Sequence, residues 1–120
     1  MKEFDELVSA LRQSREKCPW SNEKKIEDFI PEVKKEIEEL ERAFENNDTK
    51  NFREELGDVL MDLMYIAVLA EEKGHFEIKE MIDEVKRKLV RRKPWVFGNE
   101  TVRDSADAVR RWNEIKKLEK

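Results

Sequence analysis

The chain has 120 residues, which leaves room for one domain rather than two normal cores. Charged residues number 54, and apolar types make up only 38% of the chain. Because no apolar run reaches about 18 residues, a membrane-spanning protein is excluded. The single Cys18 excludes a disulfide framework, and three Gly and three Pro argue against a turn-rich all-β chain. A soluble helical domain is the class that fits.

The net charge of −4 gives no pull toward nucleic acid or toward an anionic membrane, so neither is expected as a partner. The first residues contain acids and no apolar signal segment. Together with the unpaired Cys18, this favours the reducing cytoplasm as the location.

Apolar residues recur at steps of three and four, and this spacing predicts an all-α fold, an antiparallel helical bundle of about five helices. Residues 1–120 are expected to form a single domain. The expected helices cover residues 2–16, 26–44, 50–73, 77–92 and 104–118, with a loop over 93–102. Ser21 is expected to cap the second helix and Asp48 or Thr49 the third. Pro31 is expected to mark the start of the regular part of the second helix, and Gly74 the end of the third.

The third predicted helix changes character halfway. Between Val59 and Ala70 only Asp62 is charged, and the other residues are apolar or aromatic. A helix that is apolar all round has to be buried all round, which a small monomer cannot achieve. We therefore expect a homo-oligomer, a dimer or a dimer of dimers, with helix 59–70 at the interface.

Acidic residues repeat at the same spacing on two neighbouring predicted helices. Glu36 and Glu39 flank the apolar stripe of one helix, and Glu55 and Asp58 flank that of the next. A short turn joins the two helices, so the two carboxylate pairs are expected to face each other. Hard oxygen ligands in this number suit Mg²⁺, with Mn²⁺ as the alternative, and Mg²⁺ points to a phosphorylated substrate.

The same acidic spacing occurs elsewhere in this Glu-rich chain, for example at Glu77 and Glu80, so solvated surface pairs are the competing interpretation. Asp62 continues the acidic face within an apolar run and favours the metal site. Gly57 costs about 1 kcal/mol inside a helix, which suggests the close approach of another group.

Cations crowd the end of the fourth predicted helix. Lys88 and Arg92 share a face there and are expected to hold phosphate oxygens, although cations also favour helix C-termini for electrostatic reasons alone. Trp112 lies on the inner face of the last predicted helix, either as a core residue or as the wall of a nucleoside pocket.

Five motifs in order resemble MazG-type nucleoside triphosphate pyrophosphohydrolases, over nearly the whole chain. The central one is REELGDVL at residues 53–60, which resembles the family's R-x-E-L-G-D signature. The other four are CPW at 18–20, EEKGHF at 71–76, KLVRRKPWVFG at 88–98 and WNEIK at 112–116.

The resemblance implies an all-α fold, obligate oligomers and Mg²⁺-dependent cleavage of nucleoside triphosphates to nucleoside monophosphate and pyrophosphate, which clears excess or aberrant nucleotides. Glu36, Glu39, Glu55 and Asp58 match the family's metal ligands and catalytic acids. Lys88, Arg92 and Trp112 match positions that hold the nucleotide.

The chain departs from the family pattern at several positions. Lys35 replaces the first motif acid, Lys93 and Trp95 replace two His, and Asp62 stands where Gln is common. A narrower substrate such as dUTP, dCTP or phosphoribosyl-ATP is therefore an alternative. A non-catalytic helical dimer and a nucleic-acid binder using residues 86–93 are the other two.

Overall fold

The computed structural model describes residues 1–119, which form helices and no strands. The all-α expectation is therefore confirmed. The helices are α1 (Lys2–Lys17), α2 (Pro19–Glu23), α3 (Ile26–Glu45), α4 (Thr49–Glu72), α5 (Ile78–Arg92), α6 (Pro94–Phe97) and α7 (Ser105–Leu118). The five predicted helices correspond to α1, α3, α4, α5 and α7. None of the helices in the described part is long and apolar enough to cross a membrane.

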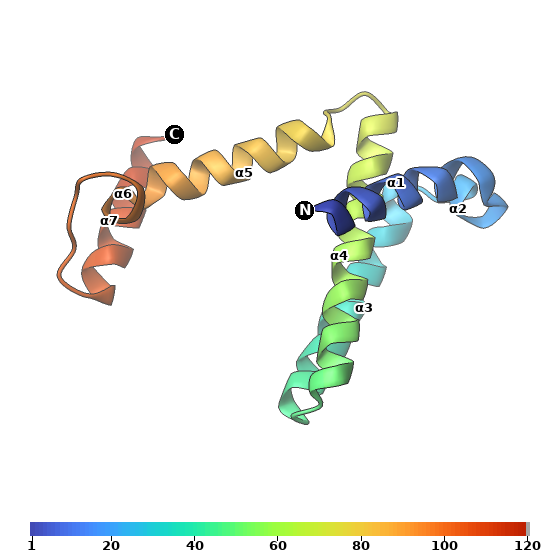
Figure 1. The fold of residues 1–120 in the computed structure, drawn as a ribbon, viewed down its shortest axis with the longest axis horizontal. Helices are drawn as coiled ribbons and strands as arrows, with labels where there is room; N and C mark the ends of the chain where they lie inside the picture. Colours follow the sequence, from blue (N-terminus) through green and yellow to red (C-terminus); the bar gives the residue numbers. More distant parts are fainter. Residues whose placement is uncertain (120) are drawn as a thin grey trace. The chain divides into compact units, whose positions relative to one another are not determined.

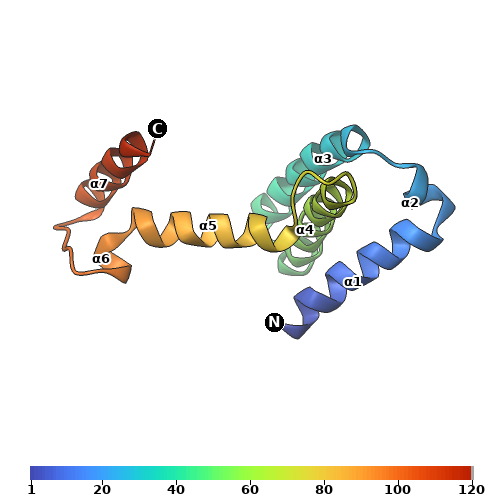
Figure 2. The ribbon, with the colours of Figure 1, turned by 90° about the horizontal axis from the view of Figure 1, so that it is seen from above.

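The chain divides into two compact units, residues 1–78 and 79–120. In the first unit α3 and α4 pack side by side as an antiparallel hairpin, and α1 contacts α2 and α4 (Figures 1 and 2). The core of this unit centres on α4, where Met64, Val68 and Leu69 are almost fully buried. In the second unit α5 is followed by the short α6 and by α7. The expectation of one domain over 1–120 stays a prediction.

The turn between α3 and α4 follows the predicted chemistry. Asp48 caps α4, its Oδ1 accepting a hydrogen bond from the backbone N–H of Asn51 at 3.1 Å. Asn47 adopts a φ of 54°, a left-handed conformation that asparagine tolerates better than most residues. This tight connection sets α3 and α4 antiparallel and adjacent. Gly74, with a φ of 75°, ends the α4 segment as expected.

Three local expectations were wrong. Ser21 does not cap α3, because it lies inside α2 and is fully buried. Residues 93–102 were expected to form a loop, but they contain the short helix α6. Pro94 is the first residue of α6, since proline suits the first turn of a helix. The helix α3 starts at Ile26 as predicted, but its regular part does not start at Pro31, which lies inside the helix. Its start is stabilised by Asp28, whose Oδ2 accepts from the Lys25 backbone N–H at 2.9 Å.

The apolar stripes are only partly covered within one chain. On α3, Phe29 is buried, but Ile30, Ile37 and Phe44 are exposed. On α5 only Ile78 is buried, and on α7 only Ile115. The helices therefore carry the predicted apolar stripes, but much of each stripe stays exposed to solvent in a single chain.

We predict that Asp48→Ala lowers the free energy of unfolding by about 1 kcal/mol, because the first turn of α4 loses its side-chain acceptor. Urea unfolding followed by circular dichroism measures this change. Asp48→Asn keeps an acceptor oxygen and should stay close to wild type. Equal stability of Asp48→Ala and wild type would contradict the cap.

Candidate metal and nucleotide site

Three of the four predicted carboxylates meet across the α3–α4 hairpin. Glu36 and Glu39 lie one turn apart on α3, and Glu55 faces them from α4. One oxygen of each residue lies within 4.8 Å of the corresponding oxygen of the other two. All three side chains are half-buried. Helical spacing and a short turn thus bring together acids that are up to 19 positions apart in the sequence.

The cluster is electrostatically unfavourable without a cation. The pKa of Glu36 is raised to about 8, first by the neighbouring Glu55 carboxyl, with which it can share a proton, then by burial and by Glu39. Oε2 of Glu36 and Oε2 of Glu55 are buried without a hydrogen-bond partner. Orphaned acceptors of this kind cost free energy unless something positive binds them.

The donor set fits a small hard divalent cation. Oxygens bound to one Mg²⁺ lie at most about 4.2 Å apart, because each sits about 2.1 Å from the ion. The carboxylate oxygens, within 4.8 Å of one another, need only a small closure to reach that spacing. Three carboxylates also leave room for water and phosphate oxygens, which Mg²⁺ retains or accepts readily.

Asp58, the fourth predicted ligand, is half-buried one turn along α4 from Glu55 and lies outside this three-carboxylate group. It lines an adjoining cavity of about 360 Å³ together with Glu36 and Asp62. Burial, followed by the charges of Glu32 and Asp58, raises the pKa of Asp62. Lys35, at the place of the first motif acid, is exposed. The acidic region therefore extends beyond the cluster into a cavity.

Gly57 does not mark a close approach within one chain. A Cβ built at this position meets no atom within 4 Å, and the residue is exposed. The expectation of a tightly packed neighbour at Gly57 was therefore wrong for the isolated chain.

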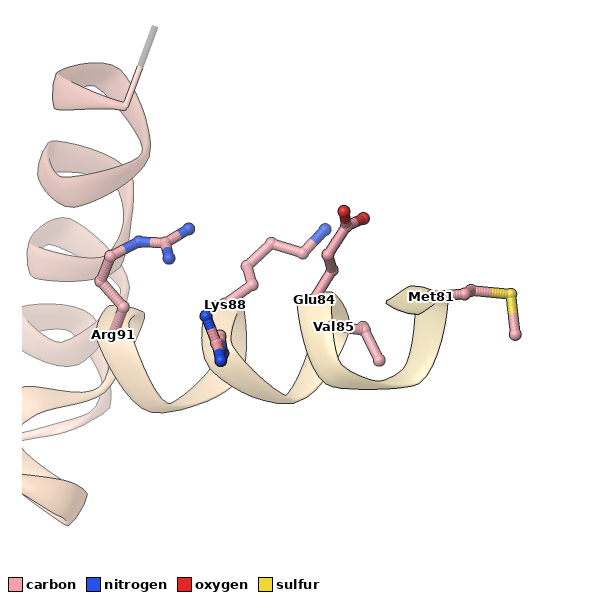
Figure 3. Close-up of a pocket in the computed structure, with 6 residues that line it drawn as sticks. Met81, Glu84, Val85, Lys88 and Arg91 are labelled. Carbon is pink, nitrogen blue, oxygen red and sulfur yellow. The ribbon is translucent and has the colours of Figure 1, made fainter. Parts of the chain in front are cut away.

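Lys88 belongs to the second unit, where it lies on one surface of α5. Glu84, Lys88 and Arg91 project to the same side of this helix, and Met81 and Val85 supply its apolar part (Figure 3). Lys88 has no ion pair among the described residues, so its ammonium group is free to bind an anion.

Arg92 and Trp112 lie together in the second unit, but Arg92 already has a partner. Its Nη2 lies 2.7 Å from Oε1 of Glu119, and its guanidinium carbon lies 5.2 Å from the centroid of the Trp112 ring. Glu119 also pairs with Arg91, and the two guanidinium groups lower the pKa of Glu119 to about 2. Trp112 lines a hollow with Lys93 and Trp95. An anion that approaches the Nε and Nη2 donors of Arg92 competes with Glu119.

Two features were not found from the sequence. The pairing of Glu119 with Arg91 and Arg92 was missed because the three residues are separated by 27 and 28 positions. The place of Trp20 beside the acidic cavity was missed because Trp20 and the acids of the cavity come from different helices, far apart in the sequence. The CPW motif at residues 18–20 marks Trp20 in the sequence, but it does not tell which side chains lie near Trp20 in the fold.

Comparison with known proteins confirms the resemblance. Residues 24–97, more than half of the chain, match the family described as the MazG nucleotide pyrophosphohydrolase domain. The crystal structure of a mazG-related protein from Thermotoga maritima superimposes with a TM-score of 0.84 and 33% identity, covering 94% of this chain and 98% of that one.

Curated relatives are longer than this chain. A nucleoside triphosphate pyrophosphohydrolase of Escherichia coli K12 is 30% identical over all of this chain and 47% of its own length. A nucleoside triphosphate pyrophosphohydrolase/pyrophosphatase MazG of Thermotoga maritima is 35% identical over 98% of this chain and 45% of its own length. The uncharacterized protein YabN of Bacillus subtilis is 36% identical over 98% of this chain and 24% of its own length. The chain spans about half the length of these relatives, or less.

The raised pKa of Glu36 predicts a pH-dependent stability. The pKa of an unfolded glutamate is 4.5, whereas that of folded Glu36 is about 8. Between these values the folded state holds a proton that the unfolded state has lost, so this contribution to stability falls as pH rises. We expect thermal unfolding of the metal-free protein to show this loss between pH 5.5 and 8.5, and added Mg²⁺ to raise the melting temperature more at the upper end.

Glu36→Gln should reduce both the pH slope and the Mg²⁺ effect, whereas Glu38→Gln, an exposed acid on the same helix, should leave them unchanged. Identical pH profiles for wild type and Glu36→Gln would contradict the assignment.

Proposed function

Because this chain belongs to the MazG nucleotide pyrophosphohydrolase family, we propose that it hydrolyses nucleoside triphosphates to nucleoside monophosphate and pyrophosphate with the help of Mg²⁺. The observation that carries this proposal is the cluster of Glu36, Glu39 and Glu55 with its two orphaned buried oxygens. Relatives whose names state this activity support it over the full length of the chain.

The carboxylates would hold the cation, with Mn²⁺ as a substitute for Mg²⁺. Glu36, Glu39 and Glu55 are the ligands, and Asp58 would join them or orient the attacking water from the adjoining cavity. The bound cation would polarise the α-phosphoryl group and lower the pKa of a water molecule. The oxygens of Glu36 and Glu55 that lack donors would hold the cation, and a carboxylate oxygen that the cation leaves free would accept the proton of the attacking water.

Lys88, Arg92 and Trp112 remain candidates for holding the nucleotide. Lys88 is a free cation, and Arg92 offers a planar fork for phosphate once Glu119 gives way. Trp112 presents an aromatic wall next to Arg92. The role proposed for the reaction is removal of excess or aberrant nucleotides in the cytoplasm, with no nucleic-acid or membrane partner.

We further propose that a second copy of the chain covers the exposed apolar face of the hairpin. Leu56, Leu60 and Leu63 follow one face of α4 and are 50%, 41% and 47% exposed. Ile37 and Phe44 extend the exposed apolar surface on α3. Most of the predicted interface helix 59–70, including Met64 and residues 67–70, is buried within its own chain, so the interface proposed here is the narrower face around residues 56–63. Monomers rarely expose contiguous apolar patches of this kind.

The activity is tested by pyrophosphate release from a panel of NTPs and dNTPs that includes dUTP and dCTP, with phosphoribosyl-ATP assayed in parallel. Glu55→Gln should reduce release at least about a hundredfold, because the cation loses a charged ligand at the centre of the cluster. Glu38→Gln is the matched control and should keep wild-type activity, and EDTA should abolish it.

If the protein hydrolyses dUTP, dCTP or phosphoribosyl-ATP but none of the common NTPs, it would be a pyrophosphohydrolase with a narrower substrate range. No release from any substrate by a folded oligomer in Mg²⁺ would contradict enzymatic function and favour a binding protein. Binding of nucleic acid with a steep salt dependence would favour the third alternative, residues 86–93 as a binding surface.

The interface is tested with Leu63→Glu, which places a charge in the proposed contact. Since burying an unpaired charge costs several kcal/mol, we expect the variant to be a monomer by light scattering at concentrations where wild type is an oligomer. Leu118→Glu, at a residue that is 81% exposed in the second unit, serves as the control. A wild-type monomer would contradict the interface.

A further inference from the structure

The cavity beside the carboxylate cluster has walls that suit a ring rather than a phosphate. It lies between α2, α3 and α4, and its volume of about 360 Å³ falls within the range of small-molecule sites. Trp20, Phe29 and Met61 form its apolar wall, and Asp62 lies on its polar side. Glu36 and Asp58 line the part of the cavity that adjoins the carboxylate cluster. A ligand whose triphosphate reaches the cluster can therefore place another group in the cavity.

Trp20 is exposed and has one aromatic neighbour. The residue is 58% exposed, and its ring packs at 85° to that of Phe29 with 6.4 Å between the centroids. Phe29 in turn stacks on Tyr65 at 4.8 Å, and the Tyr65 hydroxyl hydrogen-bonds with Oγ of Ser14 at 2.8 Å. Trp20 therefore stands at the outer end of a row of three aromatic rings. An exposed aromatic ring at the mouth of a cavity offers a flat face on which a base can stack.

The segment that carries Trp20 is also pinned to α1. Arg15 donates hydrogen bonds to the backbone oxygens of Ser21 and Lys24, and Asn22 Nδ2 donates to the backbone oxygen of Arg15 at 2.9 Å. Glu72, at the end of α4, holds the other side of the Arg15 guanidinium at 3.0 Å. The wall of the cavity is thus built into the fold rather than carried on a free loop.

Asp62 is a largely buried acceptor in the wall of the cavity. Its side chain belongs to a residue only 8% exposed, and it makes no hydrogen bond or ion pair within residues 1–119. Its charged neighbours Glu32 and Asp58 are acids. Lys24 also lines the cavity, but its Nζ lies over the Trp20 ring, 4.7 Å from the centroid. A ligand in the cavity that donates N–H groups would give this carboxyl group partners that its acidic neighbours cannot supply.

We propose that this cavity holds the nucleobase of the substrate, with Trp20 as its stacking surface and Asp62 as the acceptor for N–H groups on its edge. The inference rests on the proposed function, since the triphosphate has to lie at the cluster of Glu36, Glu39 and Glu55. It assigns the base to the first unit, whereas the resemblance points to Trp112 in the second.

The acceptor chemistry of Asp62 also selects among bases. A carboxylate offers two acceptor oxygens and, when ionised, no donor. Guanine presents two adjacent donors, its N1–H and its 2-amino group, whereas hypoxanthine presents the N1–H alone. The site should therefore bind a guanine nucleotide more tightly than the hypoxanthine nucleotide, from which it differs by one amino group.

The test measures binding rather than turnover, so that it can be read even if hydrolysis fails. The probes are the α,β-methylene analogue of GTP, the corresponding inosine analogue and inorganic triphosphate, each with Mg²⁺ in titration calorimetry. Wild type should bind the guanosine analogue at least about tenfold more tightly than triphosphate, because base stacking on an aromatic ring is worth about 1–3 kcal/mol.

Two variants separate the base from the phosphates. Trp20→Leu removes the flat ring but keeps apolar bulk, and Asp62→Asn keeps the shape but replaces one acceptor with a donor. Each should weaken binding of the guanosine analogue about tenfold and leave triphosphate binding unchanged. Asp62→Asn should also narrow the gap between guanosine and inosine analogues. Glu41→Gln, an exposed acid on α3, is the matched control for both probes.

Several outcomes would overturn the proposal. One is equal binding of triphosphate and nucleotide by wild type, and another is unchanged nucleotide binding in the folded variants. If the variants of Trp20 and Asp62 lose triphosphate binding and nucleotide binding to the same extent, the two residues support the fold and do not contact the base. Base-dependent binding without pyrophosphate release would refute the hydrolase activity while leaving the base site intact, so the two failures are distinguishable.

Discussion

Repulsion among the carboxylates of Glu36, Glu39 and Glu55 is the constraint on which the site depends. The α3–α4 hairpin holds these groups close enough to raise the pKa of Glu36 and leaves two buried oxygens without donors. Such an arrangement lowers stability unless a cation binds, so packing elsewhere has to hold it in place. The almost fully buried residues of α4, Val68 and Leu69, and the capped turn at Asp48 provide that support. In the function proposed here, the free energy lost at the cluster would add to the affinity for a divalent ion.

The same hairpin faces three different environments. Its acidic flank carries the cluster, its edge toward α2 forms the cavity with Trp20, and Leu56, Leu60 and Leu63 are exposed apolar side chains. Each environment follows from a position on the helical surface, because residues three or four apart share a face. One pair of helices can therefore hold a cation, contact a ligand and present a surface for a second copy of the chain.

The second unit is built differently from the first. Its helices bury few side chains, and ion pairs of Arg91 and Arg92 with Glu119 tie the ends of α5 and α7 together. Lys88 on α5, by contrast, forms no ion pair within residues 1–119. The side chains of Arg92 and Glu119 are only 14% and 19% exposed, so a phosphate that binds Arg92 there competes with an established ion pair. The unit thus combines weak internal packing with cationic groups that suit phosphate.

The sequence by itself determined the helical class, the position of the main helices and the family, and it predicted four acids as candidate ligands. All of these follow from short-range spacing and local motifs. Capping at Asp48 and the turn at Gly74 were predictable for the same reason. Only the tertiary structure decided that Glu36, Glu39 and Glu55 converge while Asp58 lines the adjoining cavity, that Arg92 is held by Glu119, and that Trp20 stands beside buried Asp62. These facts depend on residues distant in the chain, and their distances are set by how helices pack, which local spacing does not encode.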